Sequence, residues 1–546
     1  MTRTWRLPII LVLIGVLVAG IAFEGSNSDT STASVRTDSY MPTARSADAV
    51  GSTWYCAAGS ATGDASGFAE QTVSIANSSD QTVTGRLTAY SDTGEQLSTQ
   101  VKVGPHSRQN VRVSDVQRSR WASALVELSG GEVSVAQLFQ GPAGRSTGAC
   151  ASAPAKDWYF PAGSSRNGAR NLMAMFNPFP GDATVDLTFD TEDGARTPQQ
   201  FQGLVLPGSR VTVVDIGNVV TLREHVSTIV HSRTGRVVAQ QIQTADGREG
   251  SQEGLTVTLG ASAVSPVWSF ALATPPDSDA HEVIAVLNPS DADTTVEVQV
   301  QVDDADQVGS VEPYRITVAA GRSATLDLMS DARIPRSAGR WIIARSVDGT
   351  GVVVERSIGA KRVGEFGGLS YTMGVPIVAT EWLATFGDPA WANTSSLAIS
   401  NPAAVGDAVV TVTVHGVGAA KELSEAVELT IAAGSRILID LSRVLANRNE
   451  ASLSIESNQP VVVGQLIATK GPVDLMTPVV YPVSGTISVL REVVEPQVSL
   501  VSADELSTTD ETVDAPSTTV SNSSTSVSTS STSSTTASSS TTTTRR

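Results

Sequence analysis

The sequence predicts an all-β protein made of four tandem immunoglobulin-like β-sandwich repeats, and three observations support this class. Charged residues make up only 17% of the chain, below the usual share of about 25%, and Thr, Ser, Val and Ala take their place, which favours strands. Apolar and polar residues alternate over long stretches, as half-buried strands require. A set of landmarks also recurs four times in the same order.

The first landmark is a tryptophan that opens each repeat, at Trp54, Trp158, Trp268 and Trp382. Their recurrence at one site per repeat predicts that they anchor the four cores. The second landmark is an apolar strand that ends in asparagine, at Asn77, Asn177, Asn288 and Asn401. Proline follows the last three asparagines and breaks the strand, because proline cannot donate to a strand ladder.

An alternating strand, a glycine turn with Ser or Arg, and a paired run of strands complete each repeat. We place the repeats at residues 54–153, 154–263, 264–378 and 379–486. Six to eight short strands in each repeat match the size and spacing of an immunoglobulin-like sandwich. The alternative is a β-propeller with two blades per repeat, which is disfavoured because no repeat divides into two similar halves. Only residues 221–225 and 442–448 are expected to form helical turns.

The chain begins with a segment that predicts export. Arg3 and Arg6 precede an uncharged apolar run from Leu7 to Phe23, and acidic residues follow it, which orients the rest of the chain outside the cytoplasmic membrane. Residues 1–23 are therefore a retained single-pass anchor or a signal peptide cleaved after Ala22. Residues 24–53 are expected to be a flexible spacer, and residues 487–546 a disordered Ser/Thr-rich tail.

The chain has two cysteines, Cys56 and Cys150, which bracket the first repeat. An exported protein lies where disulfides persist, so we expect them to pair. The start Trp54-Tyr55-Cys56, the Asn-Pro strand ends and the Pro/Ala-Gly-Ser-Arg turns resemble an actinobacterial family of extracytoplasmic proteins known as a domain of unknown function. The resemblance spans roughly Trp54 to Pro482, although Asn77-Ser78 departs from the Asn-Pro pattern. The resemblance implies the fold described above and a location outside the cytoplasmic membrane, and it implies no catalytic residues.

No group of residues in the sequence predicts catalysis, a cofactor or a metal. The histidines fall at non-equivalent positions without metal-ligand spacing, so we interpret them as surface or strand-end residues; they are His106, His225, His231, His281 and His415. The third repeat concentrates acidic residues without the pattern of a calcium loop, and we interpret these as solvated; they are Asp277, Asp279, Asp291, Asp293, Asp303, Asp304 and Asp306. Trp391 is a weak candidate for a ligand contact on a loop.

These features favour a non-enzymatic envelope protein, a surface interaction or scaffold module that binds a cell-wall polysaccharide or an envelope protein. The alternative is a carbohydrate-processing envelope enzyme or its accessory subunit, which would require Asp and His residues from different repeats to meet in one pocket. A net charge of −18 argues against nucleic acid as a partner. We expect contact with the membrane only through the N-terminal segment.

Overall fold

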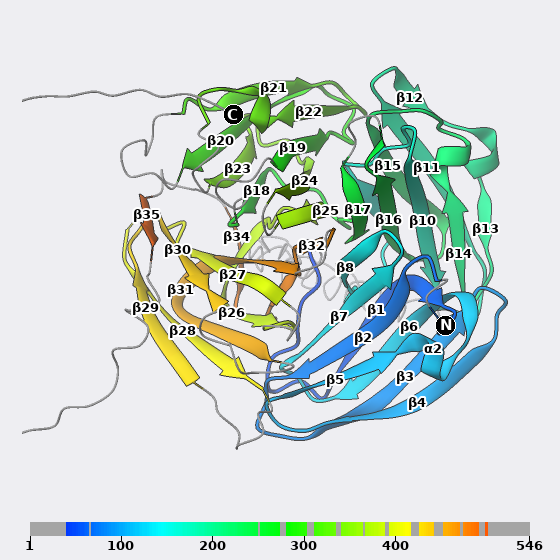
Figure 1. Ribbon diagram of the computed structural model, residues 1–546, viewed down its shortest axis with the longest axis horizontal. Coiled ribbons are helices and arrows are strands. Elements are labelled where there is room, and N and C mark those ends of the chain that lie inside the picture. Colours follow the sequence, from blue (N-terminus) through cyan, green and yellow to red (C-terminus); the bar gives the residue numbers. More distant parts are fainter. Residues whose placement is uncertain are drawn as a thin grey trace, which may run out of the picture. The chain divides into compact units, whose positions relative to one another are not determined.

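The computed structural model describes residues 40–64, 67–248, 252–272, 280–302, 311–334, 340–363, 366–387, 392–403, 405–416, 425–441, 451–469, 473–490 and 497–500. The described residues are mostly strand, which confirms the all-β prediction (Figure 1). The helical elements whose bounds are described are one short α-helix and three single turns of 3-10 helix: α2 (Val113–Val116), η2 (Gln199–Phe201), η3 (Ile216–Asn218) and η5 (Leu328–Ser330).

Each repeat contributes eight or more strands. The first contains β1 (Gly51–Ala61), β2 (Glu70–Asn77), β3 (Val83–Ser91), β4 (Gln96–Val103), β5 (Ser107–Arg112), β6 (Ser119–Ser129), β7 (Val133–Gly141) and β8 (Gly144–Ala149). The second contains β9 (Asp157–Phe160), β10 (Ala169–Asn177), β11 (Ala183–Thr191), β12 (Gly194–Arg196), β13 (Leu204–Leu206), β14 (Arg210–Asp215), β15 (Val226–Thr234), β16 (Val238–Asp246) and β17 (Glu253–Leu259).

The other two repeats follow the same order. The third contains β18 (Val267–Phe270), β19 (Ala280–Leu287), β20 (Thr294–Val302), β21 (Tyr314–Val318), β22 (Ser323–Asp327), β23 (Arg340–Ser346), β24 (Val353–Val363) and β25 (Phe366–Met373). The fourth contains β26 (Ile377–Ala384), β27 (Ala392–Ser400), β28 (Ala408–His415), β29 (Glu425–Ile431), β30 (Ser435–Asp440), β31 (Ser452–Thr469), β32 (Leu475–Met476), β33 (Val480–Pro482), β34 (Ile487–Val489) and β35 (Gln497–Leu500).

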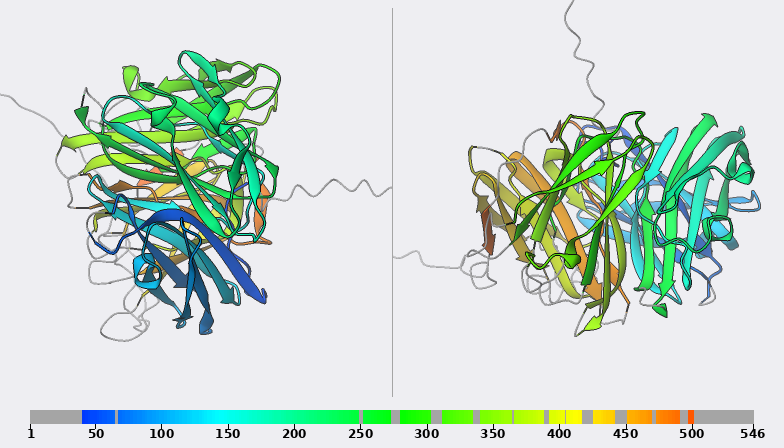
Figure 2. Two further views of the ribbon diagram at one scale, coloured as in Figure 1. Left: turned by 90° about the vertical axis from the view of Figure 1, so that its right-hand side faces the viewer. Right: turned by 90° about the horizontal axis from the view of Figure 1, so that it is seen from above.

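In every repeat, two layers of strands pack face to face. The layers are separate sheets in the second and third repeats, whereas a parallel bridge between β1 and β2 joins them in the first repeat and β31 runs through both in the fourth. In the third repeat the sheets run β18-β23-β20-β21 and β22-β19-β24-β25. Alternating strands such as β20, with every second residue buried, supply the apolar face of one layer. Trp268, Ile284, Val298 and Val354 from both layers pack into one core. The prediction of tandem sandwiches is therefore confirmed, and Figure 2 shows the layers from two further sides.

The strand order differs from that of an immunoglobulin domain in one respect. In an immunoglobulin domain, the first strand joins the sheet that contains the second and fifth strands. Here β18 pairs with β23, whereas β24 and β25 continue the sheet of β19 and β22. The repeats are nevertheless arranged around a centre like the blades of a propeller (Figure 1). Each such blade is a two-layer sandwich, because the chain crosses repeatedly between the layers: in the third repeat β18, β20, β21 and β23 form one sheet and β19, β22, β24 and β25 the other.

The recurring asparagine holds the same turn in all four repeats. Asn288 is fully buried, and its Nδ2 donates to the carbonyl oxygens of Ala292 and Val318, at 2.7 and 3.1 Å. Its Oδ1 accepts from the backbone N–H of Ser290 at 3.1 Å. The equivalent bonds form at Asn77, Asn177 and Asn401. One side chain thus satisfies three backbone groups where the strand stops.

The arginine of each glycine turn reaches into the preceding repeat. Arg210 Nη2 donates to the Thr93 carbonyl at 2.9 Å, and Arg322 Nε donates to Asp190 Oδ1 at 2.5 Å. Arg436 Nη1 donates to the Ala271 carbonyl at 2.6 Å. Arg108 of the first repeat reaches the fourth, where its Nη1 donates to the Thr385 and Ala451 carbonyls at 3.1 and 3.0 Å. The same contact therefore closes the four repeats into a ring.

The segment before β1 also crosses the junction between the first and fourth repeats. Ala44 donates to the Pro482 carbonyl at 2.9 Å and accepts from Ser484 at 2.8 Å. The Arg45 carbonyl accepts from Glu132 of the first repeat at 2.8 Å. Part of residues 24–53, expected to be a spacer, is thus built into the ring. At the other end, β34 and β35 pair with β26 and β30 although they fall within the expected tail, residues 487–546.

The disulfide prediction is confirmed, because Cys56 and Cys150 are bonded within the first repeat. The helical turn predicted at residues 221–225 is wrong. Leu222 donates to the Ser165 carbonyl at 3.0 Å and the Arg223 carbonyl accepts from Ser165, so these groups bond across the sandwich rather than within a helix. Residues 442–448 lie outside the described residues.

Helices long and apolar enough to span a membrane are absent from the described part of the chain. The apolar run at residues 1–23 lies outside that part.

Candidate functional site

Closure of the ring creates a pocket between the first and fourth repeats, which we call the seam pocket. Its volume is about 380 Å³. The first repeat supplies the turn after Asn77, the turn before β5 and the turn before β7, and the fourth supplies β26, β28 and β31. The polar residues that line it are Ser78, Ser79, Asp80, His106 and Glu132 from the first repeat, and Glu381, Thr413, His415, Ser454 and Glu456 from the fourth.

Two histidines face each other across the junction. Their rings are stacked with centroids 4.8 Å apart and an angle of 11° between the planes, and the two Nδ1 atoms are 3.0 Å apart. His106 reaches this place because it has a left-handed backbone, with φ of 48°, in the turn before β5. His415 is the last residue of β28, and 4% of its surface is exposed.

The outer nitrogens of the pair are also bonded. His106 Nε2 lies 2.7 Å from Asp80 Oδ1, and His415 Nε2 lies 2.8 Å from Ser454 Oγ. An ionised carboxylate only accepts, so His106 Nε2 carries a proton and, in the neutral ring, Nδ1 accepts. His415 Nδ1 then donates, and its Nε2 accepts from the Ser454 hydroxyl. A single hydrogen-bond chain therefore runs from Ser454 to Asp80 through the two imidazoles.

Burial disfavours charge on the inner histidine. The pKa of His415 falls to about 4, mainly because burial penalises the imidazolium and also because His106 is close, while Asp80 acts in the opposite direction. At neutral pH His415 is therefore uncharged and offers hydrogen-bonding groups rather than a positive charge.

Three glutamates surround the pair. Glu381 and Glu456 lie directly opposite each other on β26 and β31, a pairing of like charges that destabilises a sheet. Burial, followed by repulsion from Glu456, raises the pKa of Glu381. Burial, followed by repulsion from Glu381, Asp80 and Glu456, raises the pKa of Glu132. The pocket is thus rich in acceptors, two of which bind protons more readily than ordinary carboxylates.

The described residues contain no group of three or more His, Cys, Asp or Glu side chains placed to hold a metal ion. The seam pocket is suited instead to hydrogen bonding and proton transfer. Carboxylates and imidazole nitrogens accept bonds from hydroxyl groups, and protonated glutamates can donate.

The residues singled out in the sequence have varied positions. The four opening tryptophans are at most 2% exposed; they are Trp54, Trp158, Trp268 and Trp382. His225 lies 3.0 Å from Ser323 Oγ, His231 pairs with Asp157, and His281 is exposed. Asp293 accepts from Ala320 in a turn. Trp391, Asp277, Asp279, Asp303, Asp304 and Asp306 lie outside the described residues.

The interpretation of the histidines as surface or strand-end residues did not predict that two of them meet. His106 and His415 belong to the first and last repeats and meet only because the ring closes. The sequence carries no signal for this contact, because neither histidine has an equivalent in the other repeats.

Comparisons with known proteins are sparse. No curated protein matches the chain. A Thermotoga maritima 1070 crystal structure is 21% identical, with a TM-score of 0.17, and the match covers 20% of this chain and 94% of that one. A tetra-tandem repeat from the extending region of a large adhesion protein is 11% identical, with a TM-score of 0.08, over 79% of this chain and 96% of that one. TM-scores this low support no conclusion about the fold or the function of this chain. A model described as a family of unknown function, DUF5719, matches residues 132–338, from the end of the first repeat into the third.

Proposed function

We propose that this chain is a non-enzymatic envelope protein of an actinobacterium, a scaffold that lies outside the cytoplasmic membrane and binds an uncharged cell-wall polysaccharide in the seam pocket. The observation that carries the proposal is the pocket itself. Two repeats that are far apart in the sequence meet there and present carboxylates, imidazoles and hydroxyls around a space of about 380 Å³.

The chemistry of the pocket supports a polyhydroxylated ligand. Glu381, Glu456 and Asp80 are acceptors that fit sugar hydroxyls, which are good donors. The same carboxylates repel phosphate or carboxylate polymers, and the net charge of −18 acts in the same direction at longer range. An uncharged glycan is therefore the polymer that fits best.

The location outside the membrane is supported by three features. The apolar run at residues 7–23 follows arginines and precedes acidic residues, as in an exported chain. The disulfide between Cys56 and Cys150 belongs to an oxidising compartment. The Ser/Thr-rich end of the chain resembles the extended stalks of surface proteins.

The test is co-sedimentation of the full chain with insoluble wall polysaccharide, with an anionic wall polymer as the comparison. We expect saturable binding to the uncharged polymer that weakens at least about tenfold in a Glu381→Gln, Glu456→Gln double variant. Such a loss corresponds to about 1.4 kcal/mol or more, within the range for hydrogen bonds to charged groups. Glu428→Gln is the matched control, because Glu428 is exposed on β29 and does not line the pocket. Equal binding by both variants would refute the assignment.

A second function, carbohydrate processing, is favoured by one observation. Asp80 and His106 meet His415 from another repeat in one pocket, beside two glutamates with raised pKa. A carboxyl group with a raised pKa can act as the general acid in glycosidic cleavage, with a second carboxylate as its partner. Release of reducing sugar from the bound polysaccharide, lost in Glu381→Gln, would favour this function over a scaffold.

A further inference from the structure

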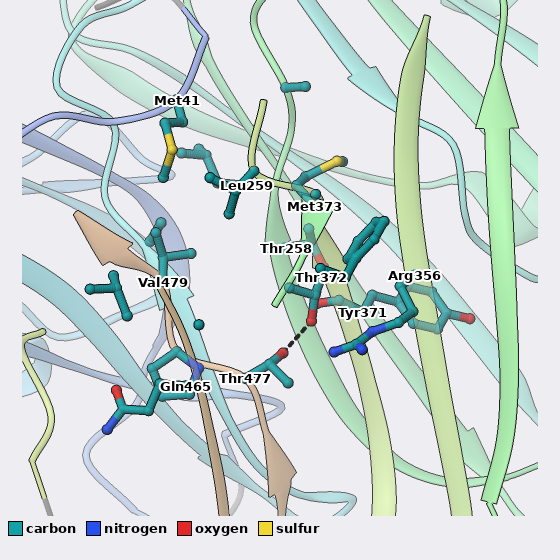
Figure 3. Close-up of a pocket in the computed structure, with 18 of the residues that line it drawn as sticks. Met41, Thr258, Leu259, Arg356, Tyr371, Thr372, Met373, Gln465, Thr477 and Val479 are labelled. Atoms are coloured by element: carbon teal, nitrogen blue, oxygen red, sulfur yellow. Dashed lines mark hydrogen bonds between the residues drawn. The ribbon is translucent and has the colours of Figure 1, made fainter. Parts of the chain in front are cut away.

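A second pocket, which we call the central cavity, is lined by residues of all four repeats, some of which Figure 3 shows. Its volume is about 100 Å³. β8, β17 and β25 of the first three repeats line it, as do Thr477–Val480 of the fourth and Tyr40–Pro42 of the segment before β1. The cavity shares no lining residue with the seam pocket, so the two are separate sites.

Most of the cavity wall is apolar. Met41, Leu259, Met373 and Val479 surround the space in Figure 3, and Phe270 is also a lining residue. Apolar cavities of this kind favour apolar ligands over water; a cavity of about 150 Å³ holds one benzene molecule. On that scale, the central cavity takes about four to six non-hydrogen atoms.

One charged side chain interrupts this apolar wall. Arg356 of β24 is 2% exposed, and its guanidinium points into the pocket, toward the side where Thr372 and Thr477 lie (Figure 3). Its Nη1 donates to the Leu272 carbonyl, and its guanidinium carbon lies 5.4 Å from the centre of the Phe270 ring. Its Nε is buried without a hydrogen-bond partner among the described residues.

The charge of Arg356 is only partly balanced. Its nearest carboxylate is Glu282, whose Oε1 is 3.4 Å from Nη1. The other oxygen of Glu282 lies 2.5 Å from Arg340 Nε, so two arginines share this carboxylate. A buried guanidinium with an unused N–H and a shared counter-ion is a site for an anionic oxygen.

A second buried polar side chain also lines the cavity. Ser269 of β18 lines the cavity, is 1% exposed, and its hydroxyl is without a hydrogen-bond partner among the residues that the structure describes. A hydroxyl can donate to a carboxylate, and an apolar residue would serve better at this place if no polar ligand were bound.

We propose that the central cavity binds a short aliphatic monocarboxylate, with its carboxylate on Arg356 and its hydrocarbon chain against Leu259 and Met373. This site goes beyond the proposed polysaccharide scaffold, because its ligand and its residues are different. A carboxylate of about two to four carbons has about four to six non-hydrogen atoms and fits the volume.

The test is titration calorimetry of the full chain with butyrate, and with 1-butanol as an uncharged ligand of similar length. We expect saturable butyrate binding with a dissociation constant below about 1 mM, which is attainable for six non-hydrogen atoms, and binding of 1-butanol at least about tenfold weaker. Absence of saturable butyrate binding, or equal binding of both ligands, would overturn the proposal.

Two variants locate the ligand. Arg356→Gln removes the charge and should abolish butyrate binding, but a change beside Glu282 can also disturb folding. Gly464→Ala avoids that difficulty, because the added Cβ would lie 3.5 Å from the Cβ atoms of Ala271 and Leu272, an ordinary contact. A methyl group is about the size of a water molecule, whose share of volume is about 30 Å³, so it takes a large part of the cavity. Butyrate binding should weaken at least about tenfold in Gly464→Ala, and unchanged affinity would place the ligand elsewhere.

Discussion

Removal of the Arg108 guanidinium should weaken the closure of the ring. In Arg108→Met the hydrocarbon stem is largely kept, whereas the two hydrogen bonds from Nη1 to the Thr385 and Ala451 carbonyls of the fourth repeat are lost. The guanidinium also lies 5.3 Å from the centre of the Phe386 ring, and this contact is lost as well.

The size of the effect follows from these contacts. A hydrogen bond that involves a charged group contributes about 1.5–3 kcal/mol. Arg108 is only half-buried, so the lower end of that range applies to each bond. The contact with Phe386 adds about 0.5–1 kcal/mol. The expected loss is therefore about 3.5–4 kcal/mol in the free energy that couples the first and fourth repeats.

Equilibrium unfolding in urea, followed by tryptophan fluorescence, measures this loss. The slope for a unit of two repeats lies in the upper part of the usual range, at about 2–3 kcal/mol per molar urea, so the midpoint should fall by about 1–2 M if the two repeats unfold together. Arg210→Met is the matched control, because Arg210 makes the equivalent contact through one exposed hydrogen bond to Thr93. Its cost should be about 1 kcal/mol or less. A midpoint for Arg108→Met equal to that of Arg210→Met would refute the view that this arginine closes the ring.

Three further predictions concern single features of the fold. Replacement of both Cys56 and Cys150 by Ser should lower the free energy of unfolding by about 4–5 kcal/mol, because the disulfide closes a loop between cysteines 94 positions apart; an unchanged thermal midpoint would contradict this. Asn401→Ala should cost about 2–4 kcal/mol in urea unfolding, since the carbonyls of Gly406 and Ile431 lose their buried donor, and a cost below about 1 kcal/mol would show that the turn is held otherwise. Burial raises the pKa of Glu355 from 4.5 to about 8, so its favourable contribution is fully present below pH 4.5 and is lost as the pH rises through 8. The wild-type free energy of unfolding should therefore fall over that interval, and Glu355→Gln should remove this slope; equal slopes would count against the assignment.

Local patterns were sufficient to predict the repeat unit. Alternation in segments such as Thr294–Val302 places every second side chain on a buried face, and a strand follows from that pattern alone. The Asn288-Pro289 pair marks the end of a strand because of the chemistry of proline, although the three bonds that Asn288 makes became visible only in the structure. The pairing of Cys56 with Cys150 was predicted because the sequence indicates export to a compartment where disulfides persist, and because two cysteines allow only one pair.

The strand order within each sandwich could not be predicted in this way. The sequence indicates which residues form strands but not which strands become neighbours, because any alternating strand can cover the same apolar core. The placement of β18 beside β23 is therefore a result of tertiary packing. The helical turn expected at residues 221–225 failed for a related reason, since bonds to Ser165 of a distant segment replaced those of a helix.

The sequence by itself determined the class, the number of repeats and the landmarks of each repeat, because these depend on periodicity and on the conformational limits of proline and glycine within a few residues. Only the tertiary structure decided that the ring closes and that His106 meets His415, Glu381 and Glu456 in one pocket. The contact between the two histidines joins residues 309 positions apart. These contacts arise from the angle at which successive sandwiches pack, which is the sum of many side-chain contacts and is not encoded in any short segment.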